Sequence, residues 1–142
     1  MPSLINLYDS ISTLLTSSIT IKNENKIIIV NAIWDTGATN SCISRKTIEQ
    51  LALLPKENRN FYSALNSEIK EVPMYKVDVI ISNDIYYDEV LVAESNTEIQ
   101  GFDFIIGMDI ISQGDFAISN CNGKTTFVFR TPSEGFNDLN KF

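Results

Sequence analysis

An apolar segment leads directly into a turn of small residues in the stretch Ile27-Ile28-Ile29-Val30-Asn31-Ala32-Ile33-Trp34-Asp35-Thr36-Gly37-Ala38. The run from Ile27 to Ile33 is rich in β-branched side chains and nearly all apolar, which predicts a strand buried on both faces. Gly37 then permits a tight turn, and the Thr36 hydroxyl can bond to the backbone and lock that turn. We therefore expect the Asp35 carboxylate to be held at a fixed point. The motif occurs once in the chain.

The size and composition of the chain limit what surrounds this turn. With 142 residues, of which 44% are hydrophobic, the chain is long enough for one domain with its own core. The net charge is −7 and the basic residues are scattered, which disfavours nucleic acid and anionic lipid as partners. No apolar stretch approaches the roughly 20 residues that cross a bilayer, and the first residues lack the basic start of a signal peptide. We therefore predict a cytoplasmic protein with no membrane partner.

The histidine and cysteine counts exclude several kinds of catalysis. The chain has no histidine, which removes Ser-His and Cys-His nucleophiles and any zinc site that needs imidazole. Its two cysteines, Cys42 and Cys121, are too few for a disulfide scaffold or a structural zinc site. We interpret them as reduced, half-buried thiols, and we expect neither a metal nor a cofactor.

Short apolar runs separated by turn signals predict a mostly β fold. Residues 3–16 have apolar side chains at helical spacing but would also suit a strand, so both interpretations stay open. We assign 1–17 to an N-terminal extension and candidate dimer contact, 18–131 to the domain, and 132–142 to a polar tail. Strands are expected at 18–22, 27–33, 42–44, 60–69, 72–81, 84–92, 102–106, 115–120 and 125–130, with short helices at 45–53 and 108–112.

A single carboxylate is a poor catalyst of peptide hydrolysis. Two carboxylates at contact distance share one proton, because both cannot ionise so close together. One of them can then take a proton from water while the protonated one polarises the substrate carbonyl. Because the chain has one Asp35 turn, the second carboxylate would have to come from a second copy across a two-fold axis.

Two segments of the chain resemble those of a known family. Trp34-Asp35-Thr36-Gly37-Ala38-Thr39-Asn40-Ser41 is similar to the active-site loop of the retropepsin-like aspartic proteases. Phe104-Ile105-Ile106-Gly107-Met108-Asp109-Ile110-Ile111 resembles the family's hydrophobic-hydrophobic-Gly segment, which opens the helix behind that loop. The order and spacing of the two segments make the match specific, and its details look closest to the bacterial, retroviral-type members. The resemblance implies a single-domain, closed β-barrel with one or two short helices.

The resemblance also implies roles for the residues of the turn. Asp35 would be the catalytic aspartate, and Thr36 would make the hydrogen-bonded grip between subunits beneath the two aspartates. Gly37 would offer its carbonyl to the backbone of the substrate. Ala38 would line the site beside it.

The remaining site residues come from more distant segments. Gly107 would let the short helix approach the catalytic loop, and we predict that Asp109 accepts hydrogen bonds from residues 39–41, because a buried carboxylate must find donors. A hairpin from Phe61 to Tyr75 would be the flap that covers the substrate. Its tip, which contains no glycine, would contact the substrate through Ala64, Leu65, Asn66 and Ser67.

The motifs together predict a homodimeric aspartic endopeptidase that acts on polypeptides, with one aspartate from each subunit in a shared dyad. An alternative is a catalytically silent module of the same fold that binds peptides or dimerises. The glycine-free flap favours this alternative, as do Thr39 and Met108, which replace the Asp–Arg pair that buttresses retroviral members. A third interpretation is a protease domain of a larger polyprotein.

Overall fold

The computed structural model describes residues 2–62, 68–95 and 101–137. The described elements are mostly strands, with two short helices and one 3-10 turn between them. They are β1 (Ser3–Leu7), β2 (Thr16–Asn23), β3 (Lys26–Trp34), β4 (Cys42–Ile43), α1 (Arg45–Gln50), β5 (Glu57–Tyr62), β6 (Ile69–Ile80), β7 (Tyr86–Glu94), β8 (Phe104–Ile106), α2 (Met108–Ile111), β9 (Asp115–Ser119), a 3-10 turn (Cys121–Gly123) and β10 (Thr126–Arg130).

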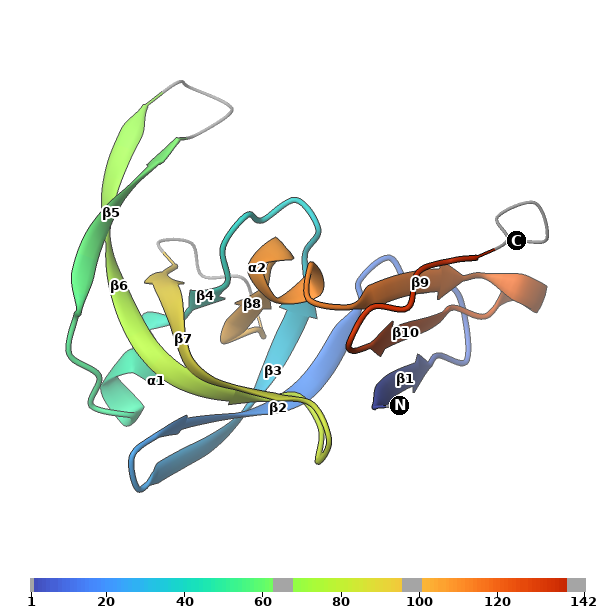
Figure 1. The fold of residues 1–142 in the computed structure, drawn as a ribbon, viewed down its shortest axis with the longest axis horizontal. Helices are drawn as coiled ribbons and strands as arrows, with labels where there is room; N and C mark the ends of the chain where they lie inside the picture. The colour runs from blue at the N-terminus through green and yellow to red at the C-terminus, as the bar shows by residue number, and fades with distance from the viewer. Residues whose placement is uncertain (1, 63–67, 96–100, 138–142) are drawn as a thin grey trace.

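Six strands close into a barrel in the order β2-β3-β8-β4-β7-β6, and the pairing of β2 with β6 completes the ring. Strand β6 is long enough to leave the barrel and pair with β5, so the β5–β6 hairpin rises from the body as an arm (Figure 1). The predicted mostly β, closed-barrel fold with short helices is confirmed. The first strand of the predicted hairpin begins earlier than expected, at Glu57, and the second also begins earlier, at Ile69; residues 63–67 lie outside the described residues.

A second, three-stranded sheet in the order β1-β10-β9 lies on the side of the molecule opposite the arm (Figure 1). Of the two possibilities open for residues 3–16, the strand is the one formed, over Ser3–Leu7, and it pairs with β10. The boundaries 1–17, 18–131 and 132–142 stay predictions.

The start of the C-terminal tail is tied to this sheet by one carboxylate. Asp115 accepts hydrogen bonds from the Ser133 hydroxyl and from the backbone N–H groups of Glu134 and Gly135. Arg130 adds an ion pair to the same carboxylate, with Nε 2.9 Å from Oδ2. These donors, above all the Ser133 hydroxyl, hold the pKa of Asp115 well below its usual range.

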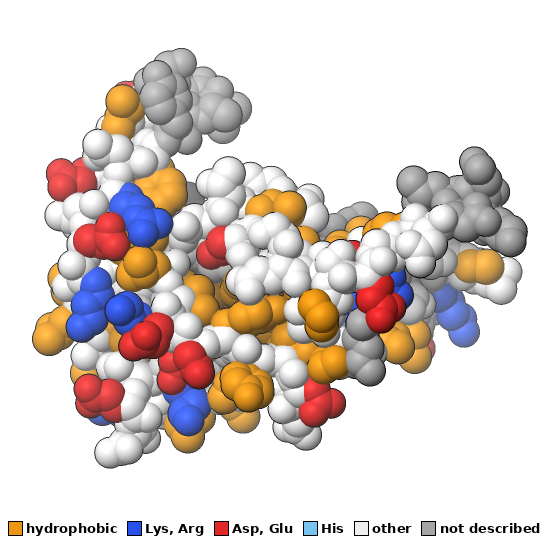
Figure 2. All heavy atoms as spheres, viewed as in Figure 1, with side chains coloured by type: hydrophobic (Ala, Val, Ile, Leu, Met, Phe, Trp, Pro, Cys, Tyr) orange, Lys and Arg blue, Asp and Glu red, His pale blue; other side chains and the backbone are white. Residues whose placement is uncertain are grey.

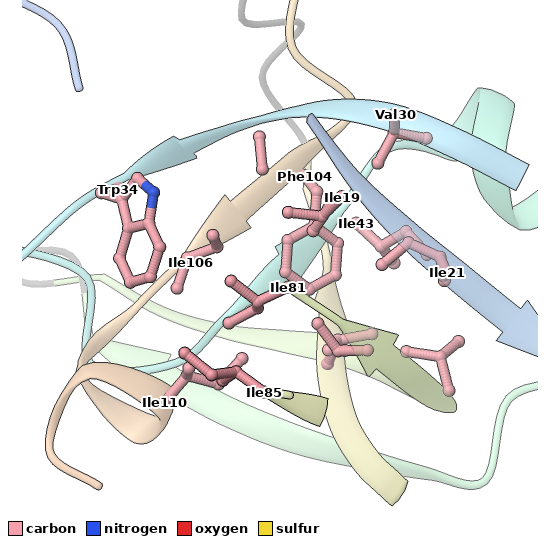
Figure 3. Close-up of a cluster of buried hydrophobic side chains, with 14 of the residues drawn as sticks. Ile19, Ile21, Val30, Trp34, Ile43, Ile81, Ile85, Phe104, Ile106 and Ile110 are labelled. Carbon is pink, nitrogen blue, oxygen red and sulfur yellow. The ribbon is translucent and has the colours of Figure 1, made fainter. Parts of the chain in front are cut away.

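The barrel encloses an aliphatic and aromatic core. Figure 3 shows side chains from β2, β3, β4, β8 and α2 directed toward one another, among them Ile19, Ile43, Phe104 and Ile110. Strand β3 contributes only alternate residues to this core. Ile27 and Ile29 are 62% and 71% exposed, so the expectation of a strand buried on both faces is wrong there. The outer face of the barrel is open to solvent at these positions, and a strand turns successive side chains to opposite faces.

Both short helices begin where the sequence predicted them. The Ser44 side chain caps α1 by accepting a hydrogen bond from the Thr47 N–H, which satisfies one of the free donors of the first turn. Helix α2 follows Gly107 directly after β8. Neither helix, nor any other in the described residues, is long and apolar enough to cross a membrane.

Candidate active site

Strand β3 carries Asp35 to its position from the centre of the barrel. Its last residues pair in parallel with β8, and the Asp35 N–H donates to the Ile106 carbonyl at 2.9 Å. The preceding residue, Trp34, is buried and its indole N–H donates to the Ser17 hydroxyl at 2.9 Å. The Trp34 ring also contacts three phenylalanine rings of the second sheet, with centroids 5.2 to 5.8 Å away. The turn therefore starts from a rigid support.

The turn itself holds the aspartate without burying it. The Gly37 N–H donates to Asp35 Oδ1 at 2.8 Å, and the Ala38 N–H donates to the Asp35 carbonyl at 3.2 Å. Asp35 is half-buried, while Thr36 and Gly37 are exposed. The carboxylate is thus fixed in direction by a backbone donor and is still accessible from solvent.

Helix α2 supports the turn from behind. The Met108 N–H donates to the Ala38 carbonyl at 2.7 Å. A Cβ atom at Gly107 would lie 2.8 Å from that carbonyl oxygen and 2.8 Å from the carbonyl carbon of Asn40. Only a glycine permits this approach without displacing backbone. The glycine thus lets the start of α2 lie close against the turn, and its part in an active site stays a prediction.

The predicted hydrogen bonds to Asp109 are present. The Ser41 N–H donates to Asp109 Oδ2 at 3.0 Å, and the Ser41 hydroxyl donates to Oδ1 at 2.7 Å. Ser41 lies in the 39–41 stretch expected to donate to Asp109 but was not itself predicted as a site residue, although it is fully buried. Its signal was weak, because a serine between a polar loop and a short strand also suits an exposed position.

Cys42 is the first residue of β4, directly after the turn. Burial, together with the nearby charges of Asp109 and Asp35, raises the pKa of Cys42 to about 11. Cys42 is half-buried as expected, but Cys121 is exposed, so the expectation of two half-buried thiols is wrong for Cys121. Cys121 lies in the turn between β9 and β10, where side chains project from the sheet into solvent.

A hollow separates the β5–β6 arm from the body of the molecule (Figure 2). The turn between β3 and β4, which carries Asp35, borders this hollow (Figure 1). The predicted flap tip, Ala64, Leu65, Asn66 and Ser67, lies outside the described residues. Within the described ranges, no three histidine, cysteine, aspartate or glutamate side chains are grouped so that they could hold a metal ion.

Residues 19–113 match the family described as gag-polyprotein putative aspartyl protease, and this match spans more than half of the chain. The chain belongs to this retropepsin-like family. The match includes both segments that the sequence analysis identified, around Asp35 and around Gly107. No curated protein matches the sequence.

Comparison with solved structures finds two that are similar to this retropepsin-like chain. It is similar to the retropepsin-like aspartic protease from Rickettsia conorii, with a TM-score of 0.57 and 10% sequence identity over 90% of this chain and 92% of the other. The retroviral protease-like domain of Ddi1 from Leishmania major gives a TM-score of 0.48 and 20% identity over 82% of this chain and 94% of the other. The first likeness shows a shared fold.

Proposed function

We propose that the protein is an aspartic endopeptidase that acts as a homodimer, each subunit supplying Asp35 to one shared dyad. The observation that carries the proposal is the Asp35 carboxylate itself. A backbone donor orients it at 2.8 Å, the turn leaves it accessible, and that turn lies beside the hollow next to the arm (Figures 1 and 2). A carboxylate fixed in this way can act on a bound molecule without first reorganising.

The hydrogen bonds of Asp109 suggest that the second carboxylate of the dyad comes from a second copy of the chain. Asp109 accepts from the Ser41 N–H and hydroxyl and from the Ile110 N–H. With three donors directed at it, this carboxylate is engaged in holding the loop and is a poor partner for Asp35. A second Asp35 across a two-fold axis would complete the dyad, and the exposed Thr36 is available for contact between the two turns.

In the proposed reaction, the two Asp35 carboxyl groups share one proton. The ionised one takes a proton from a water molecule, whose oxygen attacks the carbonyl carbon of the peptide bond. The protonated one donates to the carbonyl oxygen, giving a tetrahedral intermediate. Its collapse breaks the C–N bond as a proton passes to the leaving amine, so no covalent acyl-enzyme forms.

The test compares wild type with Asp35→Asn on a peptide library, with and without pepstatin. We expect cleavage by wild type alone and inhibition by pepstatin. Equal turnover by both proteins would refute the assignment of Asp35. Peptide binding by both proteins with cleavage by neither would support the silent module instead.

A mixing experiment tests the shared dyad separately. Wild type is titrated with Asp35→Asn protein at concentrations well above the dimer dissociation constant. If one dyad needs two Asp35 residues, an equimolar mixture should lose about half of its activity per wild-type chain, because mixed dimers are inactive. Activity per wild-type chain that stays constant, or a strictly monomeric protein in analytical ultracentrifugation, would contradict the dimeric mechanism.

A further inference from the structure

Ser41 occupies the junction between the Asp35 turn, β8 and α2. Its relative exposure is 0%, and its hydroxyl oxygen lies 3.0 Å from the Gly107 nitrogen and 2.7 Å from Asp109 Oδ1. Gly107 and Asp109 are 66 and 68 positions further along the chain. One hydroxyl therefore joins the end of the turn to two points on the segment behind it.

The direction of each hydrogen bond is determined by chemistry. The Gly107 N–H can only donate, so the Ser41 oxygen accepts from it. The single hydroxyl proton of Ser41 is then free to point at Asp109, whose ionised carboxylate can only accept. The Ser41 N–H donates to the other carboxylate oxygen at 3.0 Å. Bonds to a charged acceptor are roughly twice as strong as neutral ones, so this end of the turn is firmly anchored.

We propose that Ser41 is a positioning residue for Asp35, acting through Asp109 and Gly107. Only the expected effect on peptide cleavage rests on the proposed function; the structural role of Ser41 does not. Several hydrogen bonds attach the Asp35 turn to the segment behind it, among them the Asp35 N–H on the Ile106 carbonyl, the Met108 N–H on the Ala38 carbonyl, and those of Ser41. Removing the Ser41 hydroxyl breaks the bonds that tie the downstream end of the turn to the Gly107 N–H and to Asp109 Oδ1, and so weakens the hold of α2 on the turn.

The donors around position 109 are best matched by a carboxylate in this chain. Three donors converge on Asp109: the Ser41 N–H, the Ser41 hydroxyl and the Ile110 N–H. An asparagine has one acceptor oxygen, and its amide nitrogen would have to face one of these donors. Asp109→Asn should therefore loosen the same anchor as Ser41→Ala while preserving the shape of the side chain.

The experiment compares Ser41→Ala and Asp109→Asn with a matched control, Ser44→Ala. The Ser44 hydroxyl also accepts from a backbone N–H, that of Thr47, and also donates to an aspartate, Asp103, but it caps α1 instead of holding the turn. All variants are assayed at a temperature at which circular dichroism shows them folded. The readouts are kcat and KM for peptide cleavage, and hydrogen exchange of the amides of residues 36–40.

We expect kcat to fall at least about tenfold in both anchor variants, with a smaller change in KM, because a displacement on the order of 1 Å at a catalytic group can cost about a hundredfold in rate. Amides 36–40 should exchange faster in both, whereas Ser44→Ala should keep kcat within about twofold and exchange faster only around α1.

The two readouts separate this inference from the proposed function. If wild type cleaves no peptide, the proposed function fails, and the exchange measurement alone decides the role of Ser41. If Ser41→Ala does not fold, Asp109→Asn decides in its place. The inference is overturned if the folded anchor variants match Ser44→Ala in kcat and in the exchange of residues 36–40.

Discussion

Replacing Gly107 with alanine should destabilise the protein through a steric contact with backbone. The added Cβ would lie 2.8 Å from the Ala38 carbonyl oxygen, and 2.8 Å and 2.9 Å from the carbonyl carbon and oxygen of Asn40. Favourable contacts to carbon lie at about 3.5–4.0 Å, so each of these is an overlap. The Ala38 carbonyl also accepts a 2.7 Å bond from the Met108 N–H, so the loop cannot retreat without weakening that bond.

Two opposing effects determine how much Gly107→Ala changes the free energy of unfolding. Gly107 has φ −95° and ψ −173°, an extended conformation that alanine adopts without strain. The lower entropy of the unfolded chain would therefore stabilise Gly107→Ala by about 0.4–1 kcal/mol. Overpacking of a tight contact costs about 1–3 kcal/mol. The steric overlap should outweigh the entropic gain, with a net loss of roughly 1–2 kcal/mol in the free energy of unfolding.

The assay is urea unfolding at one fixed protein concentration, followed by the fluorescence of Trp34, the single tryptophan. Gly123→Ala is the comparison: its Cβ would meet no atom within 4 Å, so any loss of stability there comes from the strain of its φ of +72° and not from a backbone contact. Peptide cleavage should fall in Gly107→Ala and stay unchanged in Gly123→Ala. A Gly107→Ala protein as stable as wild type would refute the argument that close approach requires glycine here.

Ala52 follows α1 at φ +50°, where glycine carries no steric cost, so Ala52→Gly should raise the free energy of unfolding by roughly 0.5–1 kcal/mol in the same urea assay. Because donors depress the pKa of Asp115, its stabilising effect should be complete above about pH 4, the unfolded value, and be lost as the pH falls toward the folded value. The difference in urea midpoint between wild type and Asp115→Asn should therefore shrink from pH 7 to pH 3; a constant difference would contradict this. The half-buried Cys42 thiol, with its pKa of about 11, should be alkylated far more slowly at pH 8 than the exposed Cys121, as mass spectrometry of tryptic peptides can measure.

Much of the barrel could be predicted because its signals are local. The break between the strands expected at 115–120 and 125–130 is the turn between β9 and β10, and α1 begins at Arg45, where the helix of 45–53 was expected. The burial of β3 was predicted wrongly because an apolar run does not reveal which of its faces meets solvent. Ile27 and Ile29 are apolar and yet exposed.

Some residues of the candidate site could be predicted from local sequence signals, and others could not. Asp35 and Gly107 carry their signal in residue type, since a lone aspartate on a glycine turn and a glycine before a helix are each unusual for a stated chemical reason. Ser41 carries no such signal. Its role depends on Gly107 and Asp109, which only the folded chain brings within hydrogen-bond distance.

The sequence by itself determined the chemical groups of this protein: one aspartate on one small-residue turn, no histidine, and a glycine where two backbones must meet. Only the tertiary structure decided how they are arranged. It places β8 beside β3, so that the Asp35 N–H bonds to Ile106, and it turns the Ser41 hydroxyl toward Asp109. The physical reason is that side-chain type and periodicity are properties of neighbouring residues. The direction of a hydrogen bond, in contrast, depends on which distant group lies within about 3 Å.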